Sequence, residues 1–317
     1  MASGRTLRDN LQPMWSQNHG LGFRGIRPRP QVRRRVLAVP VCVLVLTGCA
    51  GGAELGATIE QMLDAGPGRD SSTYRAPEAA ENDELARAVL ANLAGNDDAA
   101  VPDGTRVLRA VDGGDGPVQV VTEDLDDGEV QGLGLYAVRD DVDVPPELVI
   151  EVPHPRADLY TEHLGSQLFT ALDAEALFVA GAHRTAGDSE ADVAHERAST
   201  FAAVDRAVVG AGTVVLQVHG FDESSHEGSA QVVLSSGEAT PDRVVLDLAE
   251  ALEDAGIDTC VYDGDRCPAL AGTKNVQAAH ARAVGATFIH LELARDLRES
   301  GPRREQLVEV LAEVLAR

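Results

Sequence analysis

The most informative pattern in the chain is a series of short apolar runs that alternate with segments of helical spacing from residue 148 onward. The runs 148–153 and 214–218 are apolar at nearly every position, which is typical of strands buried on both faces of a parallel sheet. In 160–172, apolar residues recur mainly at every fourth position, and this spacing predicts a helix. The other predicted strands are 176–181, 232–235, 259–262 and 287–293, and the other predicted helices are 201–209, 242–255, 276–284 and 303–316. The alternation predicts an α/β fold with a mostly parallel or mixed central sheet and helices on both of its faces.

Residues 76–145 have a different pattern, which predicts a small antiparallel β subregion ahead of the main sheet. Segment 84–94 has helical spacing, and the short apolar runs that follow it are separated by turns rich in Asp and Gly. The strands predicted from these runs are 105–111, 118–122 and 130–138. We therefore expect one domain over 76–317, with its core in 146–317.

The beginning of the chain predicts an export signal. Three arginines at 33–35 precede the apolar run 36–46, which is too short to span a bilayer and suits the core of a signal peptide. The run leads into Leu46-Thr47-Gly48-Cys49, which resembles the lipobox of bacterial lipoproteins. The resemblance implies that a signal peptide of residues 1–48 is removed and that the Cys49 thiol is diacylated. Two acyl chains would anchor the exported protein to the outer face of the cell membrane.

Two details of this segment stay open or follow from composition. Arg33-Arg34 ahead of the apolar run is also similar to a twin-arginine signal, so the sequence does not separate the two export routes. Residues 49–75 are rich in Gly, Ala, Ser and Asp, and we expect them to be a flexible tether.

The charge of the chain limits its partners. Of 317 residues, 27 are basic and 51 acidic. Because 1–48 holds eight arginines and one aspartate, the remainder has 19 basic and 50 acidic residues, a net charge of −31. Such a surface repels nucleic acid and anionic lipid, so we expect neither as a partner and attribute membrane contact to the Cys49 lipid alone. It also argues against a hydrolase of polyanions.

Two cysteines besides Cys49 remain in the chain without its signal. Cys260 and Cys267 are seven residues apart, and no histidine or further cysteine close by in sequence suggests a zinc site. Outside the cytoplasm such a pair predicts a disulfide. We expect it to close a loop at the rim of the site described next, near Asn275.

Histidines stand at the ends of two predicted strands, and a carboxylate follows one of them. His154 ends the first run, Asp158 comes four residues later, and His219 ends the run 214–218. Ligands in α/β sheets bind outside the carboxyl ends of the strands. We therefore expect His154, Asp158 and His219 to hold one metal ion, with Zn²⁺ the expected ion and a fourth position left for water. Glu162, one helical turn after Asp158, is the alternative carboxylate ligand, and Asp158 also suits a helix N-cap.

The strand 287–293 adds two polar side chains on one side. His290 and Glu292 are two residues apart, so both point to the same face. A carboxylate between Leu291 and Leu293 is costly to bury unless it is paired or near a metal. We expect Glu292 to be the catalytic general base and His290 to contact substrate or the developing oxyanion.

Short motifs in residues 148–300 also occur in a characteristic order. They are Val152-Pro153-His154 with Asp158, Ala182-His183-Arg184 with Asp192, Gln217-Val218-His219, Gly272-Thr273-Lys274-Asn275, and Phe288-Ile289-His290-Leu291-Glu292. Together they resemble N-formylglutamate amidohydrolases, which share their fold with zinc carboxypeptidases and cell-wall amidases. The resemblance implies zinc-dependent hydrolysis of an amide bond in a small molecule or peptide, with Glu292 as base. The substrate-binding candidates that it implies are Arg184, His183, Asp192, His195, Asn275 and Arg298.

The chain departs from the family at one motif. Ala194-His195 stands where the family has Asn-Arg. Since arginine binds carboxylates through two parallel hydrogen bonds, its loss leaves the substrate undefined. A second hypothesis is therefore a ligand-binding lipoprotein that keeps the fold and has no catalytic activity.

Overall fold

The structure is a computed structural model that describes residues 54–317, apart from 97–98, 127–129, 141, 227 and 316–317. The chain divides into Met1–Cys49 and Ala50–Arg317, and the fold described below belongs to the second unit. The predicted signal peptide 1–48 and the lipidation site Cys49 lie outside the described residues.

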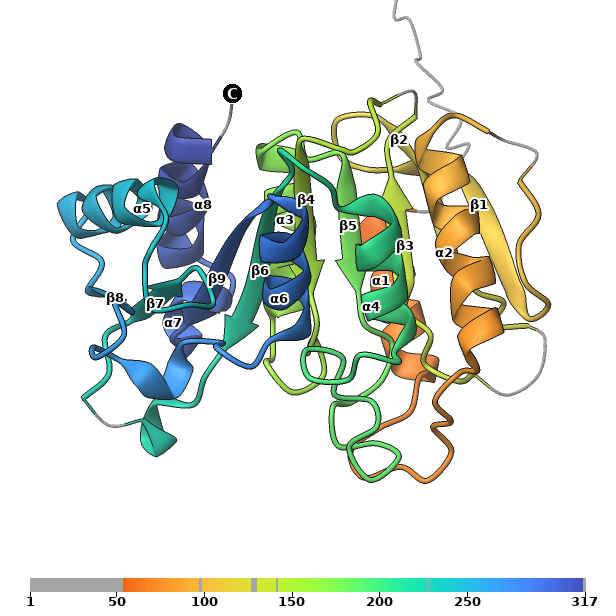
Figure 1. Ribbon diagram of the computed structural model, residues 1–317, viewed down its shortest axis with the longest axis horizontal. Coiled ribbons are helices and arrows are strands. Elements are labelled where there is room, and N and C mark those ends of the chain that lie inside the picture. The colour runs from red at the N-terminus through yellow and green to blue at the C-terminus, as the bar shows by residue number, and fades with distance from the viewer. Residues whose placement is uncertain (1–53, 97–98, 127–129, 141, 227, 316–317) are drawn as a thin grey trace, which may run out of the picture. The chain divides into compact units, whose positions relative to one another are not determined.

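A nine-stranded mixed sheet organises the fold, in the order β1-β2-β3-β5-β4-β6-β9-β7-β8 (Figure 1). Its strands are β1 Thr105–Asp112, β2 Pro117–Glu123, β3 Leu135–Val138, β4 Leu148–Val152, β5 Ala176–Val179, β6 Val214–Gly220, β7 Val232–Ser235, β8 Thr259–Val261 and β9 Thr287–Leu293. The pairs β4–β5, β4–β6, β6–β9 and β7–β8 are parallel. β1, β2 and β3 pair antiparallel and continue the sheet through β5, while β7 runs antiparallel to β9.

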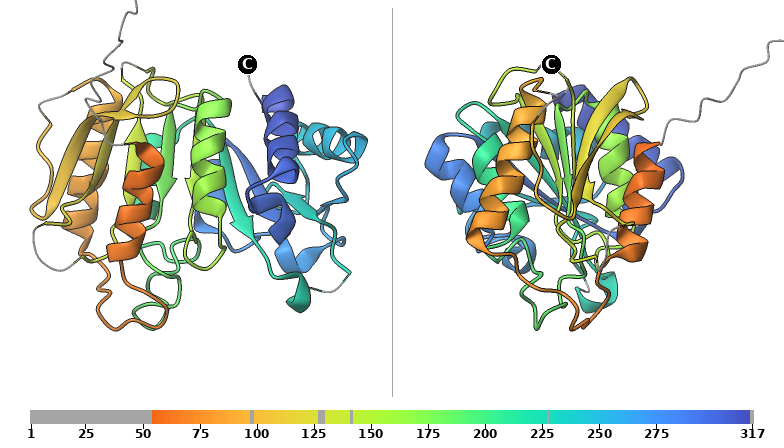
Figure 2. Two further views of the ribbon diagram at one scale, coloured as in Figure 1. Left: turned by 180° about the vertical axis from the view of Figure 1, so that it is seen from behind. Right: turned by 90° about the vertical axis from the view of Figure 1, so that its right-hand side faces the viewer.

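Helices cover both faces of this sheet. They are α1 Leu55–Ala65, α2 Ala79–Leu93, α3 Thr161–Ala171, α4 Thr200–Val208, α5 Arg243–Asp254, α6 Val276–Val284, α7 Arg295–Arg298 and α8 Pro302–Leu315. α1, α3, α5 and α8 bury apolar residues against one face, and α2, α4 and α6 against the other (Figures 1 and 2). Side chains alternate accordingly: in β4, Ile150 and Val152 belong to the first apolar layer and Val149 to the second. The sequence-based prediction of an α/β fold with an antiparallel β subregion is confirmed.

Most predicted elements agree with the structure to within a few residues, but β3 is shorter than expected. The strand predicted over 130–138 begins only at Leu135. Gly132 and Gly134 precede it with φ of +85° and +101°, a conformation that interrupts a strand. The backbone N–H groups of residues 131–133 bond instead to the buried carboxylate of Glu123.

A helix occupies part of the segment that we expected to be a flexible tether. Leu55, Ile59, Met62 and Leu63 are buried on one side of α1, where they join the apolar layer that includes α3. Their spacing of three and four residues is that of an amphipathic helix. The expectation of a flexible tether over 49–75 is therefore wrong for residues 55–65, because the Gly- and Ala-rich composition conceals a periodic apolar face.

Replacement of Ile59 by alanine tests whether α1 belongs to the folded domain. Ile59 is only 1% exposed, so the truncation leaves a cavity and is expected to lower the free energy of unfolding by about 2–5 kcal/mol. Urea unfolding measures the change. Replacement of the exposed Glu60 by alanine is the control and is expected to change stability by less than about 0.5 kcal/mol. Equal stability of the two variants would show that α1 does not contribute to the core.

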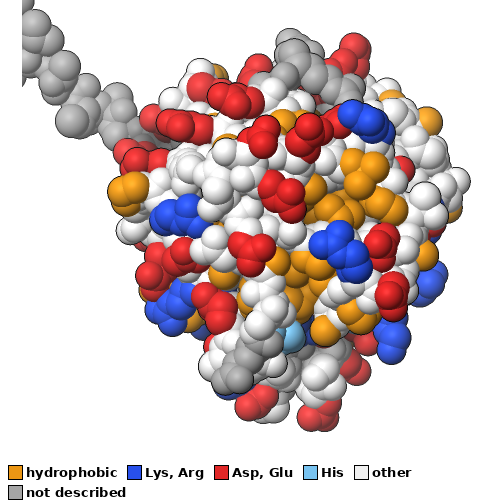
Figure 3. Space-filling model, turned by 90° about the vertical axis from the view of Figure 1, so that its left-hand side faces the viewer, with side chains coloured by type: hydrophobic (Ala, Val, Ile, Leu, Met, Phe, Trp, Pro, Cys, Tyr) orange, Lys and Arg blue, Asp and Glu red, His pale blue; other side chains and the backbone are white. Residues whose placement is uncertain are grey.

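The face at the β8 end of the sheet is shown in Figure 3. Acidic side chains are spread over it, with fewer basic ones between them, and apolar side chains are visible in its central part. None of the helices in the described ranges is long and apolar enough to cross a membrane.

Candidate metal centre

The register of three neighbouring strands brings polar side chains from distant parts of the sequence together. Glu151, Gln217 and His290 are Cα partners in one row across β4, β6 and β9, and His219 and Glu292 are partners in the next row. Because side chains alternate along a strand, all five lie on the face that α4 and α6 cover. The second row stands at the carboxyl ends of β6 and β9, where ligands of α/β sheets bind.

His154, Asp158 and His219 form the central cluster. The Nδ1 atom of His154 lies 3.6 Å from Oδ2 of Asp158, and Nδ1 of His219 lies 3.3 Å from the same oxygen. The backbone N–H of Asp158 donates to the carbonyl of His154, and this turn folds the carboxylate back over the imidazole. Their ligand atoms lie within 4.8 Å of one another, and the three residues are 1%, 8% and 5% exposed.

The second nitrogen of each histidine is held by another side chain. Nε2 of His154 lies 2.9 Å from Oδ1 of Asp192, and Nε2 of His219 lies 2.8 Å from Oε1 of Gln217. Because both partners are acceptors, they favour a proton on each Nε2, which leaves each Nδ1 a lone pair toward the centre of the cluster. This arrangement is the one by which proteins orient histidine ligands of metals. The two imidazoles and one carboxylate therefore form a possible metal site, and their donor atoms suit a divalent ion.

His290 and Glu292 adjoin this cluster. One ligand atom each of His219, His290 and Glu292 lies within 4.8 Å of the others, and the rings of the two histidines are 4.5 Å apart. Within the described residues, Nδ1 of His290 and Oε2 of Glu292 are buried without a hydrogen-bond partner. Such atoms are costly unless a ligand or water contacts them. Gly272 has φ +61°, and a Cβ there would lie 2.6 Å from the His290 ring, so the chain passes directly beside the imidazole.

Burial controls the charges of these groups. Burial, assisted by the nearby Asp158, raises the pKa of Glu292 well above its ordinary value. Burial lowers the pKa of His219 to about 4 and that of His290 well below its usual range. Burial alone would raise the pKa of Asp158, but its interactions with the adjacent imidazoles of His154 and His219 bring the pKa below its usual range. At neutral pH, therefore, Asp158 is an anion while His219 and His290 are neutral.

Arg184, Asp192 and His195 lie at the more open side of the cluster. Asp192 accepts hydrogen bonds from Nη2 of Arg184 at 2.6 Å and from Nδ1 of His195 at 3.0 Å, besides its contact with His154. The side chains of Arg184 and His195 are 35% and 44% exposed. They are therefore placed beside the ligands with part of their surface open to solvent.

The two candidate carboxylate ligands lie in different surroundings. Glu162 lies at the start of α3, with Oε1 3.6 Å from Nε2 of His163, and lines a separate hollow together with Glu60. Asp158 is the carboxylate that stands between the two histidines. The structure thus brings Asp158, and not Glu162, together with the two histidines, and the role of Asp158 as a metal ligand stays a prediction.

Arg298 points into the protein. Its guanidinium donates to the backbone carbonyls of Leu293, Leu159 and Phe221 at 3.1, 2.6 and 2.9 Å, and the residue is 4% exposed. A Cβ on Gly220 would lie 2.3 Å from this guanidinium, so the arginine packs directly on the backbone that follows His219. These contacts tie together three segments around the site, and substrate binding by Arg298 stays a prediction.

Asn275 and His183 are also buried. Asn275 is the N-cap of α6, where its Oδ1 accepts from two backbone N–H groups and its Nδ2 donates to Oε1 of Gln217. His183 is 4% exposed, and its Nδ1 accepts from the backbone N–H of Thr185 at 3.2 Å. Substrate contact by either residue stays a prediction, and the geometry of Asn275 assigns it a positioning role.

A buried polar network beneath the cluster was missed in the sequence. Nε2 of Gln217 donates to Oε2 of Glu151 at 2.8 Å, and Oδ2 of Asp205 lies 2.8 Å from Nδ1 of His280. Oε1 of Glu151 and Oδ1 of Asp205 are buried without a partner in the described residues, and the two carboxyl groups interact, which favours a proton on one of them. The position of Glu151 inside an apolar run, like that of Glu292, could have indicated a buried carboxyl group with a polar partner. Nothing in the sequence pointed to Asp205 as its partner.

The acid pair predicts a pH dependence of stability. Burial raises the pKa of Glu151 well above its usual range and that of Asp205 to about 8. In the unfolded chain both ionise near pH 4, so between about pH 4 and 8 unfolding releases protons and the pair's contribution to stability falls as pH rises. Glu151→Gln removes one of the two acids, and its free energy of unfolding is expected to decline less than the parent's between pH 5 and 8. Urea titrations at both pH values measure this, with the exposed Glu147→Gln as control. Equal declines in parent and variant would contradict the buried protonated pair.

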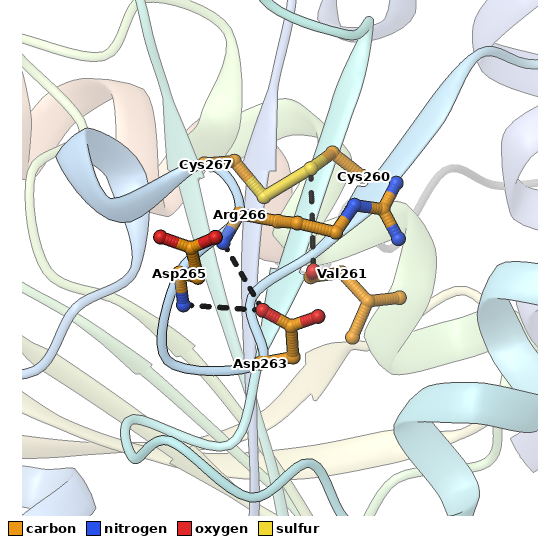
Figure 4. Close-up of a disulfide and its surroundings, with 6 residues drawn as sticks. All are labelled: Cys260, Val261, Asp263, Asp265, Arg266 and Cys267. Atoms are coloured by element: carbon orange, nitrogen blue, oxygen red, sulfur yellow. Dashed lines mark hydrogen bonds between the residues drawn. A yellow bond between two sulfur atoms is a disulfide. The ribbon is translucent and has the colours of Figure 1, made fainter.

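The segment that leads to Gly272 is closed by the two cysteines. Figure 4 shows Cys260 in β8 joined to Cys267, and the carboxylate of Asp263 accepting two backbone N–H groups inside the loop. Both cysteines pack against the apolar cluster that contains Phe221, two residues after His219. The loop thus packs close to the segment that follows His219, and its place at the rim of a site stays a prediction.

No protein-family model and no curated protein matches the chain. Among solved structures it is similar to a bacteriophage poly-gamma-glutamate hydrolase, at 12% identity and a TM-score of 0.43 over 60% of this chain and 91% of that one. It is also similar to an N-formylglutamate amidohydrolase from Ralstonia eutropha JMP134, at 16% identity and a TM-score of 0.39 over 57% and 95% of the two chains. A putative carboxypeptidase A from Shewanella denitrificans OS-217 has 16% identity and a TM-score of 0.37 over 77% and 69%. Likeness at this level concerns the fold and does not extend to an activity.

Proposed function

We propose that this chain is a zinc-dependent hydrolase of amide bonds. The observation that carries the proposal is the convergence of two histidine Nδ1 atoms on one oxygen of Asp158, with both Nε2 atoms held by acceptors. Two imidazoles and one carboxylate suit zinc and leave a coordination position for water. The amide substrate is inferred from the order of motifs that resembles N-formylglutamate amidohydrolases.

The residues around the ligands have separate tasks in this proposal. A zinc ion held by His154, Asp158 and His219 would acidify a bound water and polarise the substrate carbonyl. The positive charge of the bound ion would offset the burial that raises the pKa of Glu292 and keep this group ionised. The Glu292 carboxylate would then accept the proton of the attacking water at Oε2 and pass it to the leaving nitrogen. The unpartnered Nδ1 of His290 would contact the substrate beside it. Arg184, half-exposed next to Asp192, would bind an acidic group of the substrate.

The test is hydrolysis of a panel of N-acyl amino acids and short cell-wall peptides by the protein from residue 50 onward. Activity is compared after removal of metal with a chelator and after addition of Zn²⁺. Turnover of any member that disappears with the chelator and returns with zinc is the expected result. Stoichiometric zinc with no turnover on the whole panel would favour the alternative, a ligand-binding protein.

Export and lipid anchoring at Cys49 are part of the same proposal. They rest on the basic segment, the apolar run and the Leu46-Thr47-Gly48-Cys49 motif. Mass spectrometry of the N-terminal peptide from a bacterial membrane fraction would detect a diacylated cysteine at position 49. An unmodified Cys49 in that fraction would remove the anchor from the proposal.

The exported protein is expected to contain no free thiol at Cys260 or Cys267. Alkylation without reduction should label neither residue, and alkylation after reduction should label both. Because the bond closes a loop of only a few residues, replacing both cysteines by serine is expected to cost about 2 kcal/mol of stability. Labelling of either thiol before reduction would show that the disulfide does not form in the cell.

A further inference from the structure

We propose that Gln217 is a positioning residue, which fixes His219 in the tautomer whose Nδ1 is free to bind a metal ion in this cluster. The inference rests on the proposed metal centre and adds to it a residue that would contact neither the metal ion nor the substrate. The geometry behind it is the 2.8 Å contact between Oε1 of Gln217 and Nε2 of His219.

Two neighbours of His219, Asp158 and Gln217, favour opposite tautomers of its imidazole. Nδ1 of His219 lies 3.3 Å from Oδ2 of Asp158, and a carboxylate at this distance favours a proton on Nδ1. A protonated Nδ1 has no lone pair and cannot bind a metal. Gln217 opposes this effect, because its carbonyl oxygen is an acceptor beside Nε2 and favours a proton on that nitrogen. The balance between Asp158 and Gln217 therefore sets the fraction of the protein in which Nδ1 of His219 is unprotonated and can bind a metal ion.

The orientation of the Gln217 amide is itself fixed from one side by Asn275. Oδ1 of Asn275 accepts from the backbone N–H groups of Gln277 and Ala278 at 3.0 and 3.1 Å, as the N-cap of α6. The nitrogen of the Asn275 amide must then face Gln217, to whose Oε1 it donates. A rotated Gln217 amide would place two N–H groups against each other.

Gln277 fixes the same amide from the other side. Its Nε2 donates to the carbonyl of Val193 at 3.0 Å, so its Oε1 faces Gln217 and accepts from Nε2 at 3.4 Å. Glu151 provides a second acceptor for that nitrogen at 2.8 Å. Backbone groups of the α6 N-terminus and of Val193 thus determine, through three side-chain amides, which nitrogen of His219 carries its proton.

Burial makes this chain of amides effective. Gln217 and Gln277 are 0% exposed and Asn275 is 3% exposed, so water does not replace any of these partners. The proton position on His154 is fixed differently, by the carboxylate of Asp192, which is partly exposed. A neutral amide in a buried place holds the His219 proton without adding a charge to the interior.

The first test replaces Gln217 by methionine, which keeps the volume and removes the acceptor. Zinc affinity is measured by competition with a chromophoric chelator. The tautomer is measured by ¹⁵N NMR of the imidazole in the metal-free protein, with the His219 signals assigned by their loss in His219→Ala. We expect zinc affinity about 10- to 100-fold weaker and a large fraction of His219 with its proton on Nδ1.

The matched control is Gln119→Met. Gln119 is a buried glutamine (6% exposed) in β2, which is separated from β6 by three strands of the sheet. The variant loses an amide of the same kind away from the site, and we expect parental zinc affinity and the parental His219 tautomer. Equal weakening of zinc binding in both variants would show that general destabilisation, and not the acceptor at 217, causes the loss.

Asn275→Asp tests the amide chain without touching His219. The carboxylate keeps the N-cap, since aspartate caps as well as asparagine does, but it presents an oxygen to Oε1 of Gln217. We expect the Gln217 amide to rotate, the His219 proton to move toward Nδ1, and zinc affinity to fall. This variant also decides the matter if Gln217→Met does not fold.

The outcomes separate this proposal from the function on which it rests. A parent protein that binds no zinc would refute the metal centre, while the NMR experiment would still report the tautomer. A parent that binds zinc, with unchanged affinity and an unchanged His219 tautomer in Gln217→Met and Asn275→Asp, would refute the positioning role and leave the metal centre standing.

Discussion

Replacement of Glu292 by glutamine is expected to abolish hydrolysis while the protein keeps its metal. The amide has nearly the same shape and can no longer accept a proton, and general base catalysis contributes a factor of about 10²–10⁴. Glu292 lies in the row next to Gln217 and His290, with Oε2 buried and without a partner in the described residues. Turnover of the best substrate from the panel, together with zinc content, measures the effect.

The control for this variant is Glu299→Gln. Glu299 lies near the surface and pairs with Arg295 at 2.7 Å, so its replacement should leave both turnover and zinc content unchanged. Full turnover in Glu292→Gln would exclude Glu292 as the base. Loss of zinc in Glu292→Gln would show instead that this carboxylate belongs to the ligand set.

The double replacement His154→Ala/His219→Ala is expected to remove the metal altogether. It eliminates both imidazole ligands and leaves Asp158 alone, which cannot hold zinc at ordinary concentrations. The parent should contain close to one equivalent of zinc and unfold at a higher temperature when zinc is added. At 100 times the dissociation constant, bound zinc adds about 2.7 kcal/mol of stability, which the double variant should lack.

His163→Ala/His226→Ala provides the matched control for the double variant. Both histidines are outside the two ligand groups identified in the structure. This control should keep its zinc and its zinc-dependent stabilisation. Equal zinc content in the two double variants would place the metal elsewhere. If the parent binds no zinc after reconstitution, His154, Asp158, His219 and Glu292 have structural roles only.

The fold could be predicted because its strands are nearly continuous apolar runs. The apolar runs that end at Val152 and Val218, for example, predict strands buried on both faces. The histidines that follow these runs indicate the edge of the sheet at which a site is expected. The helix α1 was not predicted, because its helical periodicity rests on only four apolar residues in a Gly- and Ala-rich segment. The predicted strand 130–138 is longer than β3, because the break at Gly132 and Gly134 depends on the hydrogen bonds that the Glu123 carboxylate accepts from that segment.

The site could be predicted only in part, because the sequence does not show how neighbouring strands align with one another. His154, Asp158, His219 and Glu292 were identified from residue type and position, and the structure brings them together. The choice between Asp158 and Glu162 depended on the turn after His154, which hydrogen bonding alone defines. The supporting residues were harder still: Asp205 on α4 meets Glu151 on β4 because of helix packing, and no spacing in the sequence records that contact.

The position of β9 has a consequence for how the protein is made. β9 lies between β6 and β7, although both precede it in the chain. Until residues 287–293 emerge from the ribosome, β6 and β7 each keep an unpaired edge, which is the kind of surface that recruits other chains. A nascent chain can therefore contain His154, Asp158 and His219 and still lack the neighbour that flanks His219. The pairing of β9 with β6 and β7 therefore completes this part of the sheet and the surroundings of His219 in one step.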